Sequence, residues 1–138
     1  MDFKKLRDIG NELDIKIPSE YTNFMLNYPL LSDSEEQGYL EETILRNADL
    51  IILNNKYFRE DIEDAIRSSG NLDFVWKSSF FVVGSDGCGN YYFLETSKSP
   101  APVYFFDHEL LGYEYLASDI NGLLKHFIDV SNEVKSWK

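Results

Sequence analysis

Residues 80–109 read FFVVGSDGCGNYYFLETSKSPAPVYFFDHE, and this stretch decides the fold. It contains three short runs rich in Val, Tyr, Phe and Leu, at residues 80–83, 91–94 and 103–106. Such residues fit a pleated, half-buried surface, and short apolar runs bounded by turn residues are typical of strands. Both connections are too short for a parallel crossover, so we predict an antiparallel meander.

The connection between the first two strands, GSDGCGN, contains three glycines in seven residues. Glycine adopts backbone angles that other residues resist, so this segment predicts a tight turn. We assign a structural role in the turn to Gly84, Asp86, Gly87, Gly89 and Asn90. A phosphate-binding loop is disfavoured, because a strand follows the glycines and no Lys-Ser/Thr pair does. The second connection, residues 96–102, is polar and contains two prolines, which cannot donate to a strand ladder.

The chain before the meander predicts helices. Residues 2–13 place apolar side chains near one face, with Asp2 as the N-cap. A second helix begins at Pro18 and stops before Pro29. Its spacing predicts one buried stripe, formed by Tyr21, Phe24, Met25 and Tyr28.

The patterns between residues 31 and 79 are less regular. They predict a loop over 31–38, a strand over 39–47, a helix capped by Asn47 over 48–58, and a short helix around 62–66 that ends near Gly70. Residues 71–79 are expected to be irregular, with Phe74, Val75 and Trp76 packed onto the sheet.

After the meander, residues 113–116 alternate and predict a further strand at an edge of the sheet. Ser118 or Asp119 caps a last helix over 118–130. Its amphipathic stripe is Ile120, Leu123, Leu124, Phe127 and Ile128. The element order predicts an α+β fold: an antiparallel sheet of about four to six strands covered on one face by N-terminal helices and one C-terminal helix. We expect residues 1–138 to form a single domain.

The net charge of the chain limits the classes of molecule that it can bind. Thirteen basic and twenty-four acidic residues give a net charge of −11, which repels nucleic acid and anionic membranes. The charge either attracts a basic protein or only maintains solubility. The single cysteine, Cys88, allows no intramolecular disulfide. With no apolar signal region and no membrane-spanning stretch, a cytoplasmic location is expected.

Few residues suggest chemistry. Asp107, His108 and Glu109 invite a metal or general-base interpretation, but adjacent side chains on a strand end point in different directions. A solvated turn is the favoured alternative. His126 lies off the apolar stripe of its helix, and Cys88 lies near the negatively charged Asp86 instead of in the electropositive setting that a reactive thiolate needs. We therefore predict no catalytic site, no metal and no cofactor.

The acidic residues form either a solvated face or a partner surface. They are Asp33, Glu35, Glu36, Glu41, Glu42, Glu60, Asp61, Glu63 and Asp64. Exposed aromatic rings among them would anchor a partner, and Tyr39 and Trp76 are the candidates. The predicted partner-binding residues are Asp33, Glu35, Glu36, Tyr39, Glu41 and Trp76.

Several of these segments together resemble the SUKH superfamily. They are the glycine-rich turn with its flanking strands, the segment VYFFDHE, the helix start IPSEYTNFM at residues 17–25, and the last helix. The resemblance covers about residues 14–130. That superfamily includes bacterial toxin-immunity proteins and a fungal regulator of cell-wall synthesis.

The resemblance implies a non-enzymatic protein-binding domain. It favours an immunity protein that occludes a toxin domain, which would be basic if the toxin is a nuclease. The alternative is a regulatory scaffold of a signalling or cell-wall pathway. An enzyme that uses Asp107, His108 or Asp86 is a third hypothesis. A monomer and a dimer are both compatible with the sequence.

Overall fold

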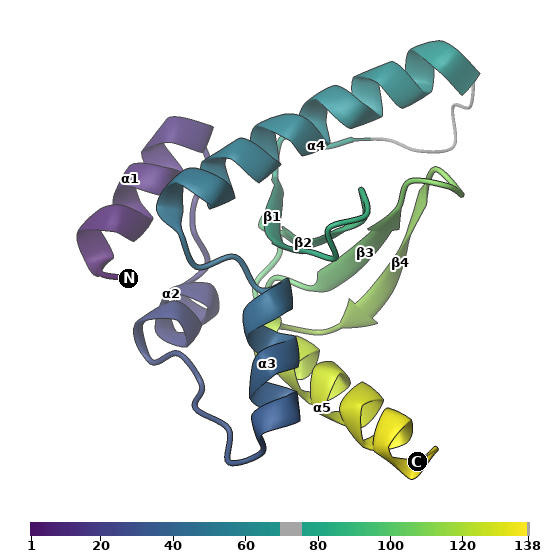
Figure 1. Cartoon of the computed structure of the whole chain (residues 1–138). Helices are drawn as coiled ribbons and strands as arrows, with labels where there is room; N and C mark the ends of the chain where they lie inside the picture. The colour runs from purple at the N-terminus through teal and green to yellow at the C-terminus, as the bar shows by residue number, and fades with distance from the viewer. Residues whose placement is uncertain (70–75, 138) are drawn as a thin grey trace.

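The protein has an α+β fold, as the element order predicts. The structure, a computed structural model, describes residues 1–69 and 76–137 (Figure 1). Its elements are α1 (Phe3–Leu13), α2 (Ser19–Leu26), α3 (Ser34–Thr43), α4 (Ala48–Ser69), β1 (Phe80–Ser85), β2 (Tyr91–Glu95), β3 (Val103–Asp107), β4 (Gly112–Ala117) and α5 (Ile120–Ser136).

The sheet is the predicted antiparallel meander, with strand order β1-β2-β3-β4. Phe81 pairs with Leu94 between β1 and β2, and Phe93 pairs with Tyr104 between β2 and β3. A register shift at Val82/Gly84 bends the end of β1. The predicted edge position of β4 is confirmed, because β4 pairs only with β3 in the described sheet.

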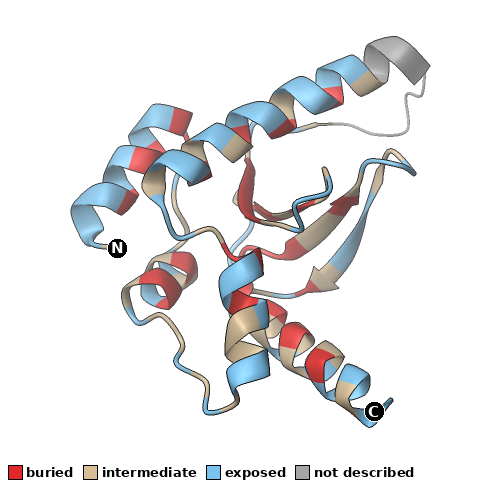
Figure 2. Ribbon diagram, in the orientation of Figure 1, coloured by how far each residue is buried: buried red, intermediate tan, exposed pale blue. Residues whose placement is uncertain are grey.

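Both faces of the sheet are covered by helices, and the expectation of one covered face was wrong. On one face, residues such as Phe81, Leu94 and Val103 pack with α1, α2, α5, the end of α3 and the start of α4. On the other face, the sheet packs against Phe58 and Ile62 of α4. Figure 2 shows buried residues on β1 and on the helices at either side of the sheet. The reason lies in β1, where five consecutive residues are buried and both faces therefore need a cover.

The free edge of β1 is closed by α4 and by the segment before it. Asn55 is 1% exposed, and its side chain accepts a hydrogen bond from the Val82 N–H (2.7 Å) and donates one to the Val82 carbonyl (3.0 Å). The Leu45 N–H donates to the Val83 carbonyl (3.0 Å), and Ile44 forms an isolated bridge with Gly84. These contacts satisfy buried backbone groups that another strand would otherwise have to pair.

Four helix starts agree with the sequence, including that of α4, where the Asn47 side chain accepts from the Leu50 N–H (3.1 Å). Asp2 caps α1 by accepting from the Lys5 N–H (2.9 Å), and Asp119 caps α5 by accepting from the Gly122 N–H (2.8 Å). Pro18 is the N-cap residue of α2, which buries Tyr21, Phe24 and Met25 as predicted.

The loop and strand predicted over 31–47 were wrong, because α3 occupies most of this segment. The Asp33 carboxylate accepts from the N–H groups of Glu35 (2.9 Å) and Glu36 (3.0 Å), which starts the helix. Leu40, Thr43 and Ile44 are buried at a helical spacing. Only Ile44 retains strand character, as the isolated bridge.

A break between two helices near residue 60 was also wrong, since α4 is continuous from Ala48 to Ser69. No Gly or Pro lies in this span, and Phe58 and Ile62 are neighbours on its buried side. The predicted helix end near Gly70 and the packing of Phe74 and Val75 fall outside the described residues. Trp76 does pack against the second core cluster, as predicted.

Candidate functional site

The outward side of α3 presents acidic residues around one aromatic ring. Tyr39 is 41% exposed, and Glu35 and Glu42 lie four residues before it and three residues after it, on the same helix face. Glu41 is also exposed and accepts a hydrogen bond from the Gln37 side chain (3.2 Å). We call Glu35, Tyr39, Glu41 and Glu42 the α3 surface.

The start of α3 is held against the end of α5. Lys135 lies 2.5 Å from the Asp33 carboxylate and 3.9 Å from that of Glu36. The hydrogen bond from Lys135, together with the N–H groups of α3, holds the pKa of Asp33 below its usual value. Two of the predicted partner-binding residues, Asp33 and Glu36, therefore have a part in joining two helices.

We expect Lys135→Ala to lower the melting temperature by about 2 °C at neutral pH, as for other exposed ion pairs. Because the pKa of Asp33 is lowered in the folded state, the stability it contributes is present above the unfolded pKa and disappears as the pH falls through the folded value. The difference from the unmodified protein should therefore vanish in acid, as measured by thermal unfolding from pH 7 to pH 2. Lys125→Ala, at an exposed position of α5, is the control and should show no such dependence.

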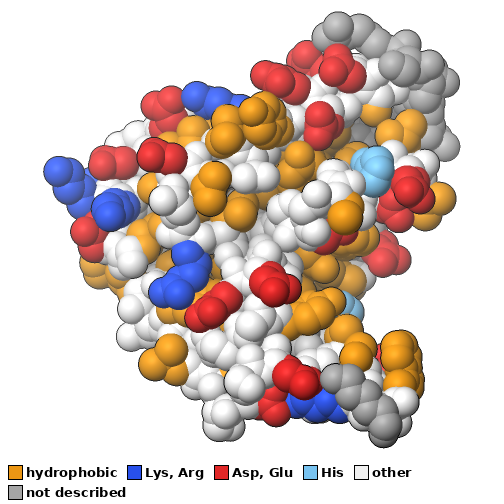
Figure 3. Space-filling view, viewed as in Figure 1, with side chains coloured by type: hydrophobic (Ala, Val, Ile, Leu, Met, Phe, Trp, Pro, Cys, Tyr) orange, Lys and Arg blue, Asp and Glu red, His pale blue; other side chains and the backbone are white. Residues whose placement is uncertain are grey.

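A row of aromatic rings runs from α3 across α5 to β3. The ring centroids of Tyr39 and Phe127 are 5.8 Å apart, those of Phe127 and Tyr92 are 5.5 Å apart, and those of Tyr92 and Phe105 are 5.0 Å apart. Phe127 is buried, and the other three rings are partly or largely exposed. Figure 3 shows the surface hollowed between α5 and the sheet, with hydrophobic side chains along the hollow. We call these four residues the aromatic row.

Tyr92 in this row is a neutral hydrogen-bonding group at physiological pH. Burial raises its pKa to about 12, and the neighbouring Tyr39 and Asp86 add to the shift. The row therefore offers apolar ring surface together with phenol hydroxyls, a combination that is typical of protein-binding anchors.

The predicted acidic residues form two groups instead of one surface. Glu60, Asp61, Glu63 and Asp64 belong to the second half of α4, which covers the other face of the sheet (Figure 1). Asp61 accepts a hydrogen bond from the Tyr91 hydroxyl (3.1 Å), so it also has a structural contact.

Trp76 belongs with α4 and not with α3. Its ring lies 5.3 Å from the guanidinium carbon of Arg59, and its side chain packs against the core cluster beneath α4. The structure thus places Trp76 apart from the other five predicted partner-binding residues.

The residues of the glycine-rich turn hold its backbone. Asp86 accepts from the N–H of Cys88 (2.8 Å) and from the backbone and side chain of Asn90 (3.3 and 2.7 Å). Gly87 and Gly89 have φ values of 79° and 89°, a conformation that favours glycine. A Cβ at Gly84 would stand 2.9 Å from the Thr43 carbonyl, so the end of α3 approaches β1 closely here.

The turn after β3 is tied to this loop by hydrogen bonds. The Asn90 side-chain oxygen accepts from the His108 N–H (3.0 Å), and the His108 Nδ1 lies 2.7 Å from it. Asp107 accepts from the Glu109 N–H (2.9 Å), as in a local turn. Over residues 1–69 and 76–137, no group of three His, Cys, Asp or Glu side chains is arranged to hold a metal.

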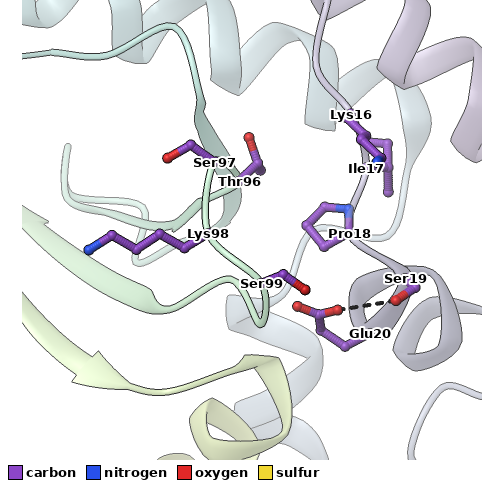
Figure 4. A pocket seen from close by; sticks show the side chains of 9 residues that line it. All are labelled: Lys16, Ile17, Pro18, Ser19, Glu20, Thr96, Ser97, Lys98 and Ser99. Carbon is purple, nitrogen blue, oxygen red and sulfur yellow. Dashed lines mark hydrogen bonds between the residues drawn. The ribbon is translucent and has the colours of Figure 1, made fainter.

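A polar pocket of about 560 Å³ lies where the α1–α2 link meets the β2–β3 loop (Figure 4). Lys16, Lys98 and several hydroxyl groups line it, and Glu20 projects beside Ser19. The Glu20 carboxylate accepts from the Ala101 N–H (2.7 Å) and from the Ser19 hydroxyl (3.3 Å). Sequence reasoning missed this pocket, because its two segments are about eighty residues apart in the chain.

The chain was compared with protein-family models, curated proteins and solved structures. The model of the SMI1 / KNR4 family (SUKH-1) matches residues 2–126. Neither a curated protein nor a solved structure gives a significant match. Among the helices that the structure describes, none has the length and apolar character needed to cross a membrane. The family match covers most of the sequence, confirms the resemblance found in the turn, strands and helices, and establishes that this chain belongs to the SMI1 / KNR4 family (SUKH-1).

Proposed function

We propose that this protein is a non-enzymatic, cytoplasmic immunity protein that binds a basic bacterial toxin domain and occludes its active site. The observation that carries the proposal is the α3 surface, where Glu35 and Glu42 flank an exposed tyrosine beside the aromatic row and Glu41 is exposed further round the same helix. Membership of the SUKH family supports an immunity-protein or regulatory domain in general, and implies binding to another protein.

Occlusion by this surface follows from its chemistry. The carboxylates of Glu35, Glu41 and Glu42 would take the place of substrate phosphates in a basic nuclease site. Tyr39 would supply the buried anchor that most tight interfaces need. The net charge of −11 would accelerate encounter with a basic partner, and this effect weakens as salt is added.

The first test is an affinity capture from the native cell lysate at low and at raised salt, with bound proteins identified by mass spectrometry. A single basic, toxin-like protein that salt displaces supports the proposal. The same toxin domain is then expressed with and without this protein. If the toxin kills cells equally well in both cases, the immunity role is excluded.

Charge reversal on α3 tests the surface itself. Glu35→Lys combined with Glu42→Lys should weaken binding to that toxin domain at least about a hundredfold, since each reversed charge costs a few kcal/mol at a complementary interface. Isothermal titration calorimetry measures the affinity. The control pair Asp8→Lys and Glu60→Lys changes the net charge equally at exposed positions of α1 and α4. Equal losses for both pairs would show a general charge effect and would contradict a contact at α3.

A regulatory scaffold is the second candidate function, and the family also supports it. It predicts several housekeeping partners in the same capture experiment. It also predicts a growth or cell-wall phenotype on deletion, with no toxin gene nearby. These outcomes separate it from immunity.

A further inference from the structure

We propose that the outer edge of β4 is a docking site where an extended, basic segment of the partner adds to the sheet as a further strand. The inference rests on the proposed function, because it takes the partner to be a basic protein. It adds the mode of binding: main-chain pairing at one strand, next to the aromatic row.

The two edges of the sheet differ. The edge of β1 is occupied by the Asn55 side chain and by the residues Ile44 and Leu45. At β4, by contrast, no hydrogen bond joins the outer edge to any other described part of the chain. Figure 1 shows β4 at the margin of the molecule, beyond β3. A strand edge of this kind is a template for pairing with another chain.

β4 has only part of the usual protection of an edge, namely the charged Glu114 and a register shift in its pairing with β3. Its sequence, GYEYLA, contains no Lys and no Pro, the residues that commonly block strand addition. Tyr115 is 58% exposed and Glu114 is exposed, and they point to opposite faces because they are adjacent in a strand. Tyr115 lies opposite Tyr104, and Glu114 lies opposite Phe105 of the aromatic row.

The charge around this edge identifies the occupant as basic. Residues 99–124 contain no Lys or Arg, whereas the same stretch contains Asp107, Glu109, Glu114 and Asp119. Glu109 and Glu114 are both exposed, at the turn before β4 and within β4. An added strand would place alternate side chains beside Glu114 and beside Tyr115, so the fitting segment alternates basic with apolar residues.

A second copy of this chain fits the edge less well. Pairing two β4 strands about a two-fold axis at Glu114, one of the two central residues of Gly112–Ala117, places Glu114 opposite its own symmetry mate. Like charges opposite each other across a strand pair are destabilising. The exposed Glu109 of each copy adds to this repulsion.

The test uses a synthetic eight-residue peptide of alternating lysine and valine with blocked ends, titrated to about 1 mM, where even weak binding is visible. Amide NMR shifts and hydrogen exchange of the full chain are recorded. We expect shifts and protection in residues 112–117. A control peptide carries N-methyl groups on backbone nitrogens along both of its edges, so neither edge can donate a full set of hydrogen bonds. It should bind at least about tenfold more weakly, because it cannot complete the ladder. Absence of shifts in β4, or equal binding of the methylated peptide, overturns the proposal.

A pair of variants supplies the matched control. The Glu114→Lys variant should bind the peptide about tenfold more weakly than the unmodified protein. The Glu42→Lys variant on α3 has the same change in net charge, and its affinity for the peptide should stay within about twofold. Equal weakening by both would show a general charge effect and would overturn the edge site. Sedimentation equilibrium tests whether a second copy of the chain occupies the edge instead. If the protein self-associates and the Glu114→Pro variant does not, the edge belongs to a second copy, and the proposal of a basic partner is contradicted.

Failure of this inference differs from failure of the proposed function. If the Glu114→Lys variant still neutralises a captured toxin fully, the β4 edge does not contact the toxin, and the immunity role remains. If the peptide binds at β4 as described but the chain protects against no toxin, the edge remains and the immunity role is lost.

Discussion

Replacing Asn55 with alanine is expected to lower the free energy of unfolding by about 3 kcal/mol, because it leaves two buried backbone groups without partners. The Asn55 side chain pairs with both the N–H and the carbonyl of Val82, at 2.7 and 3.0 Å, and is almost completely buried. It acts on the β1 edge as a short piece of strand would. No other described side chain is bonded to these two groups.

The chain supplies a matched control at the preceding residue. The Asn54 side chain donates to the carbonyl four residues earlier, Leu50 (2.8 Å), but it is only partly buried, and no hydrogen bond joins it to the described sheet. Asn54→Ala should therefore change the stability by no more than about 0.5 kcal/mol. Urea unfolding, followed by circular dichroism, measures both variants. A loss for Asn55→Ala no larger than that of the control would show that the edge contact contributes little.

Asn55→Asp gives a second, pH-dependent signature of the same contact. The introduced carboxylate keeps an acceptor for the Val82 N–H but repels the Val82 carbonyl, and burial raises its pKa. A group whose folded pKa is raised contributes stability below its unfolded pKa, and this contribution is lost as the pH rises through the folded value. The variant should therefore be closest to the unmodified protein near pH 4 and least stable at neutral pH.

The strands could be predicted because their signals are local. β1, β2 and β3 are short runs of aromatic and β-branched residues between glycine and proline turns, and neighbouring strands are joined by short connections. α3 was missed because Gly38 and the Thr43-Ile44 pair lower its helix propensity. The spacing Asp33-x-x-Glu36, which is typical of a helix start, was the available signal.

The arrangement of the candidate site could be predicted only in part. Individual acidic and aromatic residues were identified, but which face of the sheet each helix covers depends on long-range packing that no local pattern encodes. Trp76 and Tyr39 were therefore grouped, although the sheet separates them. Asn55 did leave a signal, since it lies in the buried row of α4 with Ile51, Phe58 and Ile62. A polar residue in such a row indicates a specific hydrogen bond.

Replacing Phe58 with alanine is expected to cost about 4 kcal/mol, the range found for buried phenylalanines. Phe58 is 1% exposed and is the main contact of α4 with its face of the sheet. Its ring centroid lies 5.2 Å from that of Tyr91 and 5.3 Å from those of Phe93 and Phe106. Truncation therefore removes the ring and opens a cavity between helix and sheet.

Tyr57→Ala is the control for this change, since the adjacent Tyr57 is 48% exposed and should cost less than about 1 kcal/mol. Denaturant unfolding measures both variants, and hydrogen exchange locates the effect. Protection should fall first in the second half of α4, because this part of the helix loses its largest buried ring and keeps smaller contacts with the sheet such as Ile62 and the Asp61–Tyr91 hydrogen bond. The α3 surface lies on the other face, so the folded fraction of Phe58→Ala should bind a basic partner with unchanged affinity. A loss of affinity in the folded fraction would instead place α4 in the interface.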